Sequence, residues 1–218
     1  MVLMVELPGF IAIEGPIGVG KTTLARRLSE DFEASLLLEQ PEENPFLERF
    51  YEDPRRAALP AQLSFLLTRV RQMRAMRQND LFSSTRIADF LLDKDRLFAE
   101  VTLDEDELAL YEEVYTQLVL DAPRPDLVVY LQAPVDVLLR RIEQRDRSYE
   151  RLIDPAYLTR LCARYADFFY HYNGAPLLIV NASEIDIVRN ERDYQALVDE
   201  IRTPPSGRRF FNPLPFTM

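Results

Sequence analysis

The chain has 218 residues, 47% of them hydrophobic and 28% charged, which is typical of a soluble globular protein with a substantial core. No apolar run approaches the roughly 18 residues of a membrane span, and no signal peptide pattern opens the sequence. The single cysteine, Cys162, excludes an internal disulfide framework and favours a cytoplasmic location. A net charge of −10 disfavours a nucleic-acid polymer as partner, because polyphosphate binding requires a basic surface.

Strand and helix patterns alternate along the chain. Apolar runs predict five strands, at residues 10–13, 35–38, 87–91, 127–131 and 177–180. Helical patterns cover residues 22–32, 44–51, 59–78, 93–101, 103–121, 134–144, 155–172 and 191–201. This order predicts one α/β domain over residues 1–202, with a five-stranded parallel sheet and helices on both faces. Residues 203–218 hold four prolines and are expected to form an extended C-terminal tail.

A phosphate-binding motif lies between the first strand and the first helix. Residues 15–22 read Gly-Pro-Ile-Gly-Val-Gly-Lys-Thr and match G-x-x-x-x-G-K-[ST] completely. Glycines let backbone amides surround a phosphate, and the helix N-terminus adds a favourable dipole. In this motif Lys21 reaches the β- and γ-phosphates, and the Thr22 hydroxyl ligates Mg²⁺. We expect ATP and Mg²⁺ to bind here, with contacts from Gly15, Pro16, Ile17, Gly18, Val19, Gly20, Lys21, Thr22 and Thr23.

The motif leaves the phosphate acceptor open, because GTPases, motor ATPases, nucleotide kinases and nucleoside kinases all share it. Glu39 directly follows the second strand, and the carboxyl ends of parallel strands face the ligand crevice. A carboxylate at this position can accept the proton of an attacking hydroxyl. A single acid among 36 is, by itself, more often a solvated surface group.

Further polar residues follow at distinctive spacings. Tyr51 precedes Gln62 and Arg69, which lie two helical turns apart on the predicted long helix and can face one pocket. Asp89 ends the third strand, and Asp95 lies on the next helix. Residues 140–151 are rich in arginine, as expected of a lid that stabilises charge during phosphoryl transfer; a charged helix end is the alternative.

With these motifs the chain resembles the deoxynucleoside kinases, particularly the bacterial deoxyadenosine and deoxyguanosine kinases, over nearly its whole length to about residue 202. The resemblance implies a P-loop kinase fold with an arginine-rich lid. It also implies ATP-dependent phosphorylation of the 5′-hydroxyl of a deoxynucleoside for nucleotide salvage, with purines preferred. The family is usually dimeric through its long helices, so a homodimer is expected.

The resemblance assigns roles to individual residues. It implies that Glu39 is the base for the 5′-hydroxyl and that Asp89 holds Mg²⁺ together with Thr22. The residues expected at the sugar are Tyr51 and Glu150. Those expected at the nucleobase are Gln62, Arg69 and Asp95. The lid arginines expected over the phosphates are Arg141, Arg145 and Arg147, of which Arg141 and Arg145 join Lys21 and Glu39 as catalytic residues.

Phe90 departs from the family pattern, because an arginine usually follows the acidic residue at the end of the third strand. That arginine orients the catalytic glutamate and binds phosphate oxygens. Arg69 and Arg86 are the candidates to compensate for it.

Two other functions fit the phosphate loop. A nucleoside monophosphate kinase of the thymidylate kinase type needs basic residues around its acceptor, whereas residues 39–48 are strongly acidic and suit a neutral acceptor. A regulatory module would bind ATP without transferring phosphate. A GTPase is disfavoured, because neither lysine lies in a guanine-binding motif, and the single histidine, His171, is interpreted as structural.

Overall fold

The computed structural model describes residues 7–78, 85–119, 122–183, 185–187 and 190–212. Six strands form one sheet in the order β2-β3-β1-β4-β5-β6, and every neighbouring pair is parallel. The strands are β1 (Phe10–Glu14), β2 (Ser35–Leu37), β3 (Arg86–Ala88), β4 (Leu127–Gln132), β5 (Leu177–Asn181) and β6 (Arg208–Phe211). The predicted α/β fold with a parallel sheet is therefore confirmed.

The sheet has one strand more than the five predicted. β6 lies within the predicted C-terminal tail and pairs with β5, with Leu177 opposite Arg208. Half of its residues are arginines, so it lacks an apolar run, although Phe211 packs against the core. The Arg208 guanidinium donates to the carbonyls of Phe169 and Tyr170, and Arg209 donates to Glu200. Residues 213–218 of the predicted tail lie outside the described residues.

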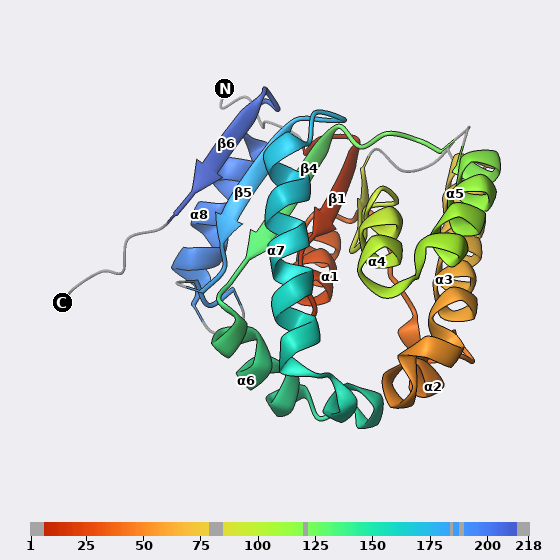
Figure 1. The fold of residues 1–218 in the computed structure, drawn as a ribbon. Coiled ribbons are helices and arrows are strands. Elements are labelled where there is room, and N and C mark those ends of the chain that lie inside the picture. The colour runs from red at the N-terminus through yellow and green to blue at the C-terminus, as the bar shows by residue number, and fades with distance from the viewer. Residues whose placement is uncertain (1–6, 79–84, 120–121, 184, 188–189, 213–218) are drawn as a thin grey trace, which may run out of the picture.

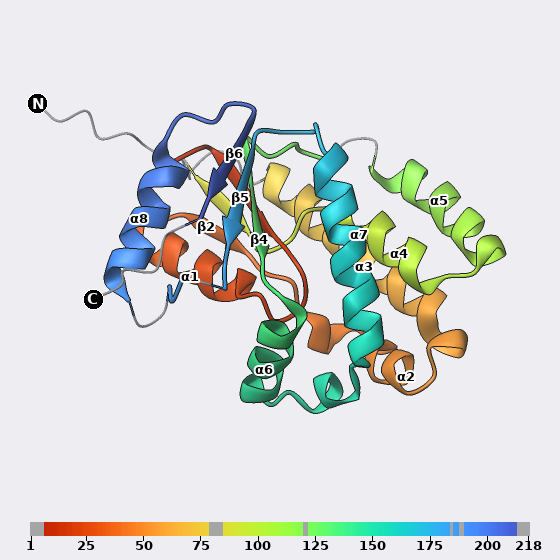
Figure 2. The same ribbon diagram turned by 60° about the vertical axis from the view of Figure 1, so that its left-hand side comes forward.

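Helices cover both faces of the sheet (Figures 1 and 2). α1 and α8 lie on one face, and α7, α4 and α3 lie on the other, with α5 packed outside against α3. The helices are α1 (Lys21–Asp31), α2 (Leu47–Glu52), α3 (Pro54–Gln78), α4 (Lys94–Thr102), α5 (Glu105–Val119), α6 (Val135–Arg145), α7 (Pro155–His171) and α8 (Glu191–Arg202). Two short 3₁₀ helices are η1 (Pro41–Glu43) and η2 (Ser148–Leu152). The predicted end of the helix at residues 103–121 lies outside the described residues.

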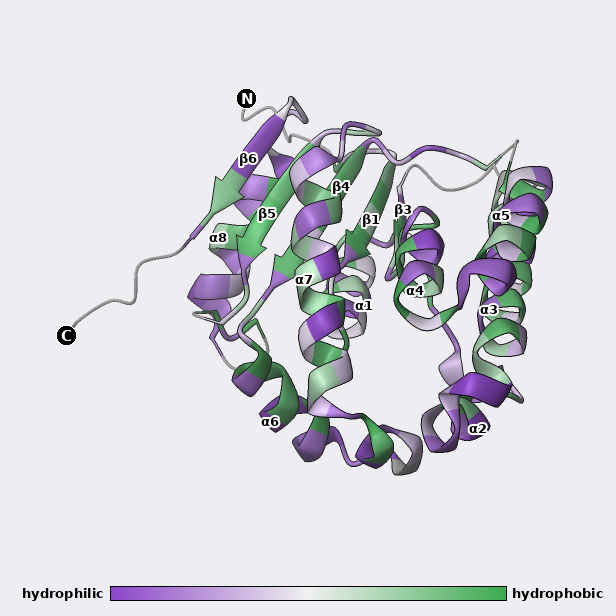
Figure 3. Cartoon of the chain, in the orientation of Figure 1, coloured by the Kyte–Doolittle hydropathy of each residue, from purple (hydrophilic) through white to green (hydrophobic). Residues whose placement is uncertain are grey.

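The core lies around the central strands β1 and β4, which are hydrophobic along almost their whole length (Figure 3). Buried parallel strands of this kind require helices on both sides. On one side, Leu24 and Leu28 of α1 are fully buried. On the other side, Tyr165 and Phe169 of α7 stack with Tyr130 of β4. Within the described ranges, no helix combines the length and apolar character needed to cross a membrane.

The strands all point toward the same edge of the sheet, where α6, η2 and α2 lie (Figure 1). The segments that follow β1, β2 and β3 therefore meet at this edge, although they are far apart in the sequence. The fold thereby brings the phosphate loop, Glu39 and Asp89 into one neighbourhood.

Candidate active site

The phosphate loop joins β1 to α1, as predicted. Gly20 is the N-cap of α1 and has φ of 108°, a backbone conformation that favours glycine. A Cβ atom on Gly15 would lie 2.3 Å from the carbonyl oxygen of Leu131 in β4. The loop is therefore packed closely against the neighbouring strand, and a side chain at Gly15 would not fit there.

Lys21 extends over this loop. Its Nζ donates to the carbonyl of Gly15 at 2.7 Å and to that of Pro16 at 3.3 Å. Burial and, secondly, the nearby ammonium of Lys94 lower the pKa of Lys21, although neighbouring carboxylates oppose both effects. The side chain thus supplies a positive charge at the mouth of the phosphate loop.

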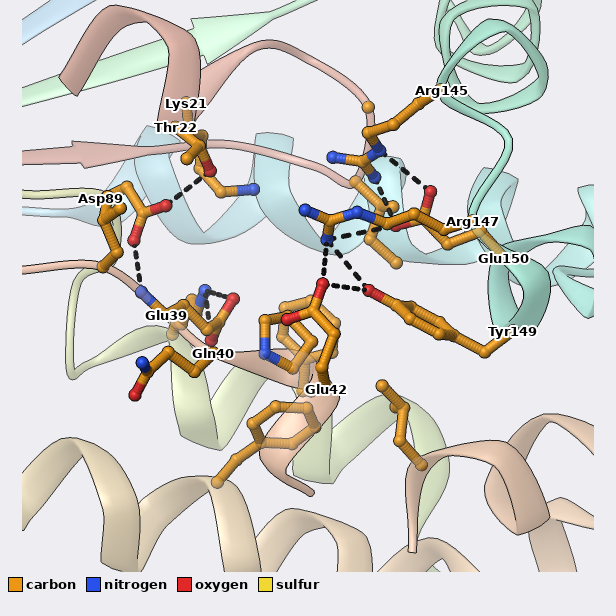
Figure 4. Close-up of a pocket in the computed structure, with 18 of the residues that line it drawn as sticks. Lys21, Thr22, Glu39, Gln40, Glu42, Asp89, Arg145, Arg147, Tyr149 and Glu150 are labelled. Atoms are coloured by element: carbon orange, nitrogen blue, oxygen red, sulfur yellow. Dashed lines mark hydrogen bonds and ion pairs between the residues drawn. The ribbon is translucent and has the colours of Figure 1, made fainter. Parts of the chain in front are cut away.

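Asp89 connects the loop to the second strand. Its Oδ2 accepts a hydrogen bond of 2.5 Å from the Thr22 hydroxyl, and its Oδ1 accepts one of 2.7 Å from the backbone amide of Glu39 (Figure 4). Burial raises the pKa of Asp89, and these two hydrogen bonds oppose the rise. The side chains of Thr22 and Asp89 therefore present adjacent hard oxygen donors, the ligand type that Mg²⁺ prefers.

A magnesium site of this kind needs few protein ligands, since Mg²⁺ is usually held by one or two side chains together with phosphates and water. In the described part of the chain, no group of three or more His, Cys, Asp or Glu side chains could hold a metal ion alone. The Thr22–Asp89 pair thus fits a phosphate-bound Mg²⁺ and not an independent metal centre.

Glu39 lies between two cationic side chains. Arg69 of α3 hydrogen-bonds to its Oε1, and the Nζ of Lys94 lies 3.2 Å from Oε1 and 3.3 Å from Oε2. Burial alone would raise the pKa of Glu39, but Arg69, Lys94 and Lys21 outweigh that effect and hold the pKa well below its usual range. The carboxylate is therefore ionised across the physiological pH range and able to accept a hydrogen bond from a hydroxyl group.

A cleft of about 340 Å³ has Lys21, Thr22 and Asp89 on one side, and Glu39 lies between this side and the helices that form the other. This volume lies within the usual range of small-molecule sites. Its opposite wall comes mainly from helices α2, α3, α4 and η2, through Tyr51, Gln62, Phe65, Arg69, Phe98 and Glu150. Phosphate-binding and nucleoside-sized features therefore share one cleft.

Of the three residues predicted to contact the nucleobase, two line the cleft and the third does not. Gln62 and Arg69 both line the cleft from α3, as their helical spacing predicted, and Gln62 contacts Thr102 at 3.3 Å. Asp95 is not among the lining residues. It is buried, and it forms an ion pair with one terminal nitrogen of Arg69 while Glu39 pairs with the other.

Two of the three lid arginines, Arg145 and Arg147, are linked to acidic residues around the cleft (Figure 4). Arg145, at the end of α6, donates to Glu150 at 2.9 Å. Arg147 lies 3.0 Å from Glu42 and 2.8 Å from the hydroxyl of Tyr149, and that hydroxyl in turn donates to Glu42. The segment after α6 is thus attached by polar contacts to the segment after β2.

Known proteins share this sequence pattern and fold. The sequence pattern of the deoxynucleoside kinase family matches residues 11–204. The chain belongs to the deoxynucleoside kinase family. It is 34% identical to the deoxyguanosine kinase of Bacillus subtilis (strain 168) over 198 residues, which cover 88% of this chain and 96% of the relative. It is 28% identical to the deoxyadenosine kinase of Lactobacillus acidophilus over 205 residues, or 88% and 94% of the two chains.

Solved structures agree with this assignment. Deoxyadenosine kinase from M. mycoides with bound dATP superimposes with a TM-score of 0.79 at 26% identity, over 89% of this chain and all of that one. The same enzyme with bound dCTP gives a TM-score of 0.76 at 25% identity, over 89% and 99%. Nucleoside triphosphates therefore bind to that relative, and this chain is a kinase with the same fold.

Arg141 of this kinase lies apart from the two other lid arginines. It donates to the carbonyls of Ala182 at 2.8 Å and Val19 at 3.3 Å, and burial lowers its pKa. It lines a second cavity of about 720 Å³ beside the phosphate loop, together with residues 182–183 and 185–187. The structure thus brings Arg145 and Arg147, but not Arg141, to the cleft that holds Glu39.

Two charged residues of the site were absent from the sequence-based assignment. Glu14 ends β1 and is fully buried, and Lys94 begins α4 and is 2% exposed. One signal pointed to Lys94, because Lys21 and Lys94 are the only lysines in the sequence. Glu14 gave no such signal, since it immediately precedes the glycines of the motif and resembles any residue at a strand end.

Proposed function

We propose that this kinase transfers the γ-phosphate of ATP to the 5′-hydroxyl of a deoxynucleoside, with purines preferred. The observation that carries the proposal is that the Glu39 carboxylate and the Lys21 ammonium line the same cleft, which is about 340 Å³ in volume. An acceptor hydroxyl beside Glu39 thus lies close to the loop that binds the donor phosphates. The names of the relatives, deoxyguanosine and deoxyadenosine kinases, support the purine preference.

The role of Glu39 follows from its ionisation. Because neighbouring cations hold its pKa low, it is a weak base but a permanent hydrogen-bond acceptor. Phosphoryl transfer through a loose transition state requires little removal of the proton before the P–O bond forms. Glu39 therefore orients the lone pair of the 5′-oxygen toward the γ-phosphorus and receives the hydroxyl proton as the new bond forms.

Positive side chains stabilise the charge that spreads over the transferring oxygens. Lys21 comes from the loop, and Arg145 and Arg147 come from the lid. When ATP binds, the two arginines would leave Glu150 and Glu42 and bind phosphate oxygens instead. Thr22 and Asp89 would hold Mg²⁺, which neutralises phosphate charge when it is bound. Positioning and charge stabilisation thus provide most of the acceleration.

The remaining cleft residues match a neutral nucleoside. Tyr51, Glu150, Gln62 and Arg69 all line the cleft. We propose that the first two bind the sugar and the last two bind the edge of the nucleobase. Phe65 and Phe98 supply apolar surface for its faces. The acidic side chains of Glu39, Glu42 and Glu150 would repel an acceptor that already carries a phosphate, which disfavours a nucleoside monophosphate.

Assembly and location complete the proposal. Helices α3 and α5, on the side of the molecule away from β6 (Figure 1), expose Leu67 (40%) and Leu110 (49%), and we propose that these two helices pair two copies of the chain in a homodimer. A cytoplasmic location agrees with the single free cysteine, Cys162.

The test is transfer of phosphate from Mg·ATP to a panel of deoxynucleosides and nucleoside monophosphates. We expect deoxyguanosine or deoxyadenosine to be the best acceptor. Glu39→Gln keeps the shape of the side chain but removes its charge, and should lower kcat about 1,000-fold, within the range for loss of a general base. Glu43→Gln is the matched control, since Glu43 is exposed in the same segment and does not line the cleft.

Two results would overturn the proposal. Preferred transfer to a nucleoside monophosphate would assign the protein to the thymidylate kinase type of activity. ATP binding without transfer to any acceptor would indicate a regulatory module.

A further inference from the structure

Lys94 is unusual for a lysine because it is buried, with only 2% of its surface exposed. A buried charge is costly unless paired charges and hydrogen bonds compensate for it. Two carboxylates do so here: Glu39, 3.2 Å away, and Glu14, 3.7 Å away. The lysine therefore connects the proposed catalytic carboxylate to the end of the central strand.

Glu14 is rigidly held on the other side of this contact. It accepts hydrogen bonds from the backbone amides of Gly15 at 2.8 Å and Leu91 at 2.7 Å, and from the Tyr165 hydroxyl at 2.8 Å. These donors come from the phosphate loop, the segment after β3 and α7. Because Glu14 is fully buried, its charge stays fixed relative to the loop.

Phe90, the residue next to Asp89, cannot provide the positive charge beside Glu39. Phe90 is fully buried in an apolar cluster with Phe10, Met73 and Met76, and it does not line the cleft. Arg86 begins β3 and does not line the cleft, whereas Asp89, just beyond the end of that strand, does. Arg69 does contact Glu39, but only through Oε1, and its guanidinium also pairs with Asp95.

Glu39 thus lies between two cations, each of which has a second carboxylate behind it. The order is Asp95, Arg69, Glu39, Lys94, Glu14. In the described part of the chain, Lys94 is the donor to Oε2 of Glu39. Without Lys94, the carboxylate is free to turn both oxygens toward Arg69, which favours a bidentate pair.

We propose that Lys94 is the positioning residue that fixes the orientation of the Glu39 carboxylate, with Glu14 as its buried counter-charge. Lys94 thereby supplies, from the first turn of α4, the cation beside Glu39 that the family resemblance led us to expect at the position of Phe90. This inference rests on the proposed function, because it concerns the orientation of Glu39 toward the acceptor hydroxyl.

The experiment measures kcat, the KM for ATP and the Kd for the best deoxynucleoside in four variants of the full chain. Lys94→Met should lower kcat about 100-fold, the loss typical of a misplacement of about 1 Å, and should change the KM for ATP and the Kd less than about threefold. Arg96→Met is the matched control, because Arg96 lies on the same helix but is exposed and pairs with Glu112. It should retain wild-type kcat.

The double variant Glu14→Gln/Lys94→Met separates positioning from charge neutralisation. It removes both buried charges, so its melting temperature should recover toward the wild-type value while its kcat stays low. A kcat restored to near the wild-type level would overturn the proposal, because Lys94 would then serve only to neutralise Glu14. This variant also provides a folded protein if Lys94→Met alone is too unstable.

Glu39→Gln/Lys94→Met tests whether Lys94 acts through Glu39. Residues that act as a unit give non-additive losses. We therefore expect kcat to equal that of Glu39→Gln within about twofold, whereas losses that multiply would contradict the proposal. If the wild-type protein phosphorylates deoxynucleosides and Lys94→Met does so within about threefold of it, only the Lys94 assignment fails; if the wild-type protein phosphorylates none, the proposed function fails.

Discussion

The two sides of the cleft are built in different ways. The phosphate side comes from one continuous segment, residues 15–22, and consists largely of backbone groups between β1 and α1. The acceptor side comes from side chains on α2, α3, α4 and η2, which are separated by up to a hundred residues in the sequence. The first is a local structure, and the second depends on the tertiary fold.

This difference changes what each side tolerates. The loop depends on its glycines for its backbone path and on the side chains of Lys21 and Thr22, which we propose contact phosphate and Mg²⁺. The acceptor side contains an alternating series of charges, Asp95, Arg69, Glu39, Lys94 and Glu14, most of them buried. Removal of one member leaves its neighbour as an uncompensated charge, so single substitutions should affect stability as well as activity.

The largest effect is expected on the phosphate side. Lys21→Met removes the cation that the loop itself supplies to the donor phosphates, and should lower kcat/KM for ATP about 1,000-fold, at the upper end of the loss for one stabilising group. The melting temperature should change little, because Lys21 donates mainly to loop carbonyls. Steady-state kinetics and thermal unfolding measure the two quantities.

Asp95→Asn tests the acceptor side of the cleft separately from the phosphate side. Asp95→Asn keeps the size of the side chain but leaves Arg69 without one of its two carboxylates. We expect the KM for the deoxynucleoside to rise about tenfold and the free energy of unfolding to fall by about 3 kcal/mol, while the KM for ATP stays unchanged. Equal changes in both KM values would contradict the division of the cleft into two sides.

The contrast also explains what could be predicted from the sequence. The order of strands and helices and the phosphate loop depend on local periodicity and spacing, and the structure confirms them from β1 to α8. Gln62 and Arg69 were predicted to share a face because helical geometry fixes their separation, and both line the cleft. β6 was missed because it is only four residues long and begins with two arginines, so no apolar run marks it, although Phe211 packs against the core.

Other parts of the site depend on packing that no local pattern encodes. The role of Lys94 requires that Phe90 turn into the core and that α4 begin beside β1, which only the assembled fold decides. Glu14 becomes a partner of Tyr165 although 151 residues separate them. Arg141 and Arg145 lie one helical turn apart on α6 and both line the neighbouring cavity, but only Arg145 also reaches the cleft that holds Glu39.

The smallest effects are expected from two buried tyrosines, which test how far the acceptor-side network extends. Tyr165 and Tyr111 are both fully buried, on α7 and α5. The Tyr165 hydroxyl donates to the Glu14 carboxylate at 2.8 Å, whereas the Tyr111 hydroxyl has no hydrogen-bond partner among the described residues. A Phe substitution therefore removes a charge-assisted hydrogen bond in one case and an unsatisfied polar group in the other.

Tyr165→Phe should lower the free energy of unfolding by about 2 kcal/mol, because the loss leaves Glu14 with only its backbone donors and the Lys94 ammonium. Tyr111→Phe should leave it unchanged or raise it by up to about 1 kcal/mol, since no hydrogen bond is lost and a buried polar group is removed. Denaturant unfolding of both variants measures the difference. An equal loss of unfolding free energy in Tyr111→Phe would contradict the prediction. It would show that the loss in Tyr165→Phe comes from altering a buried tyrosine in general and not from the hydrogen bond to Glu14.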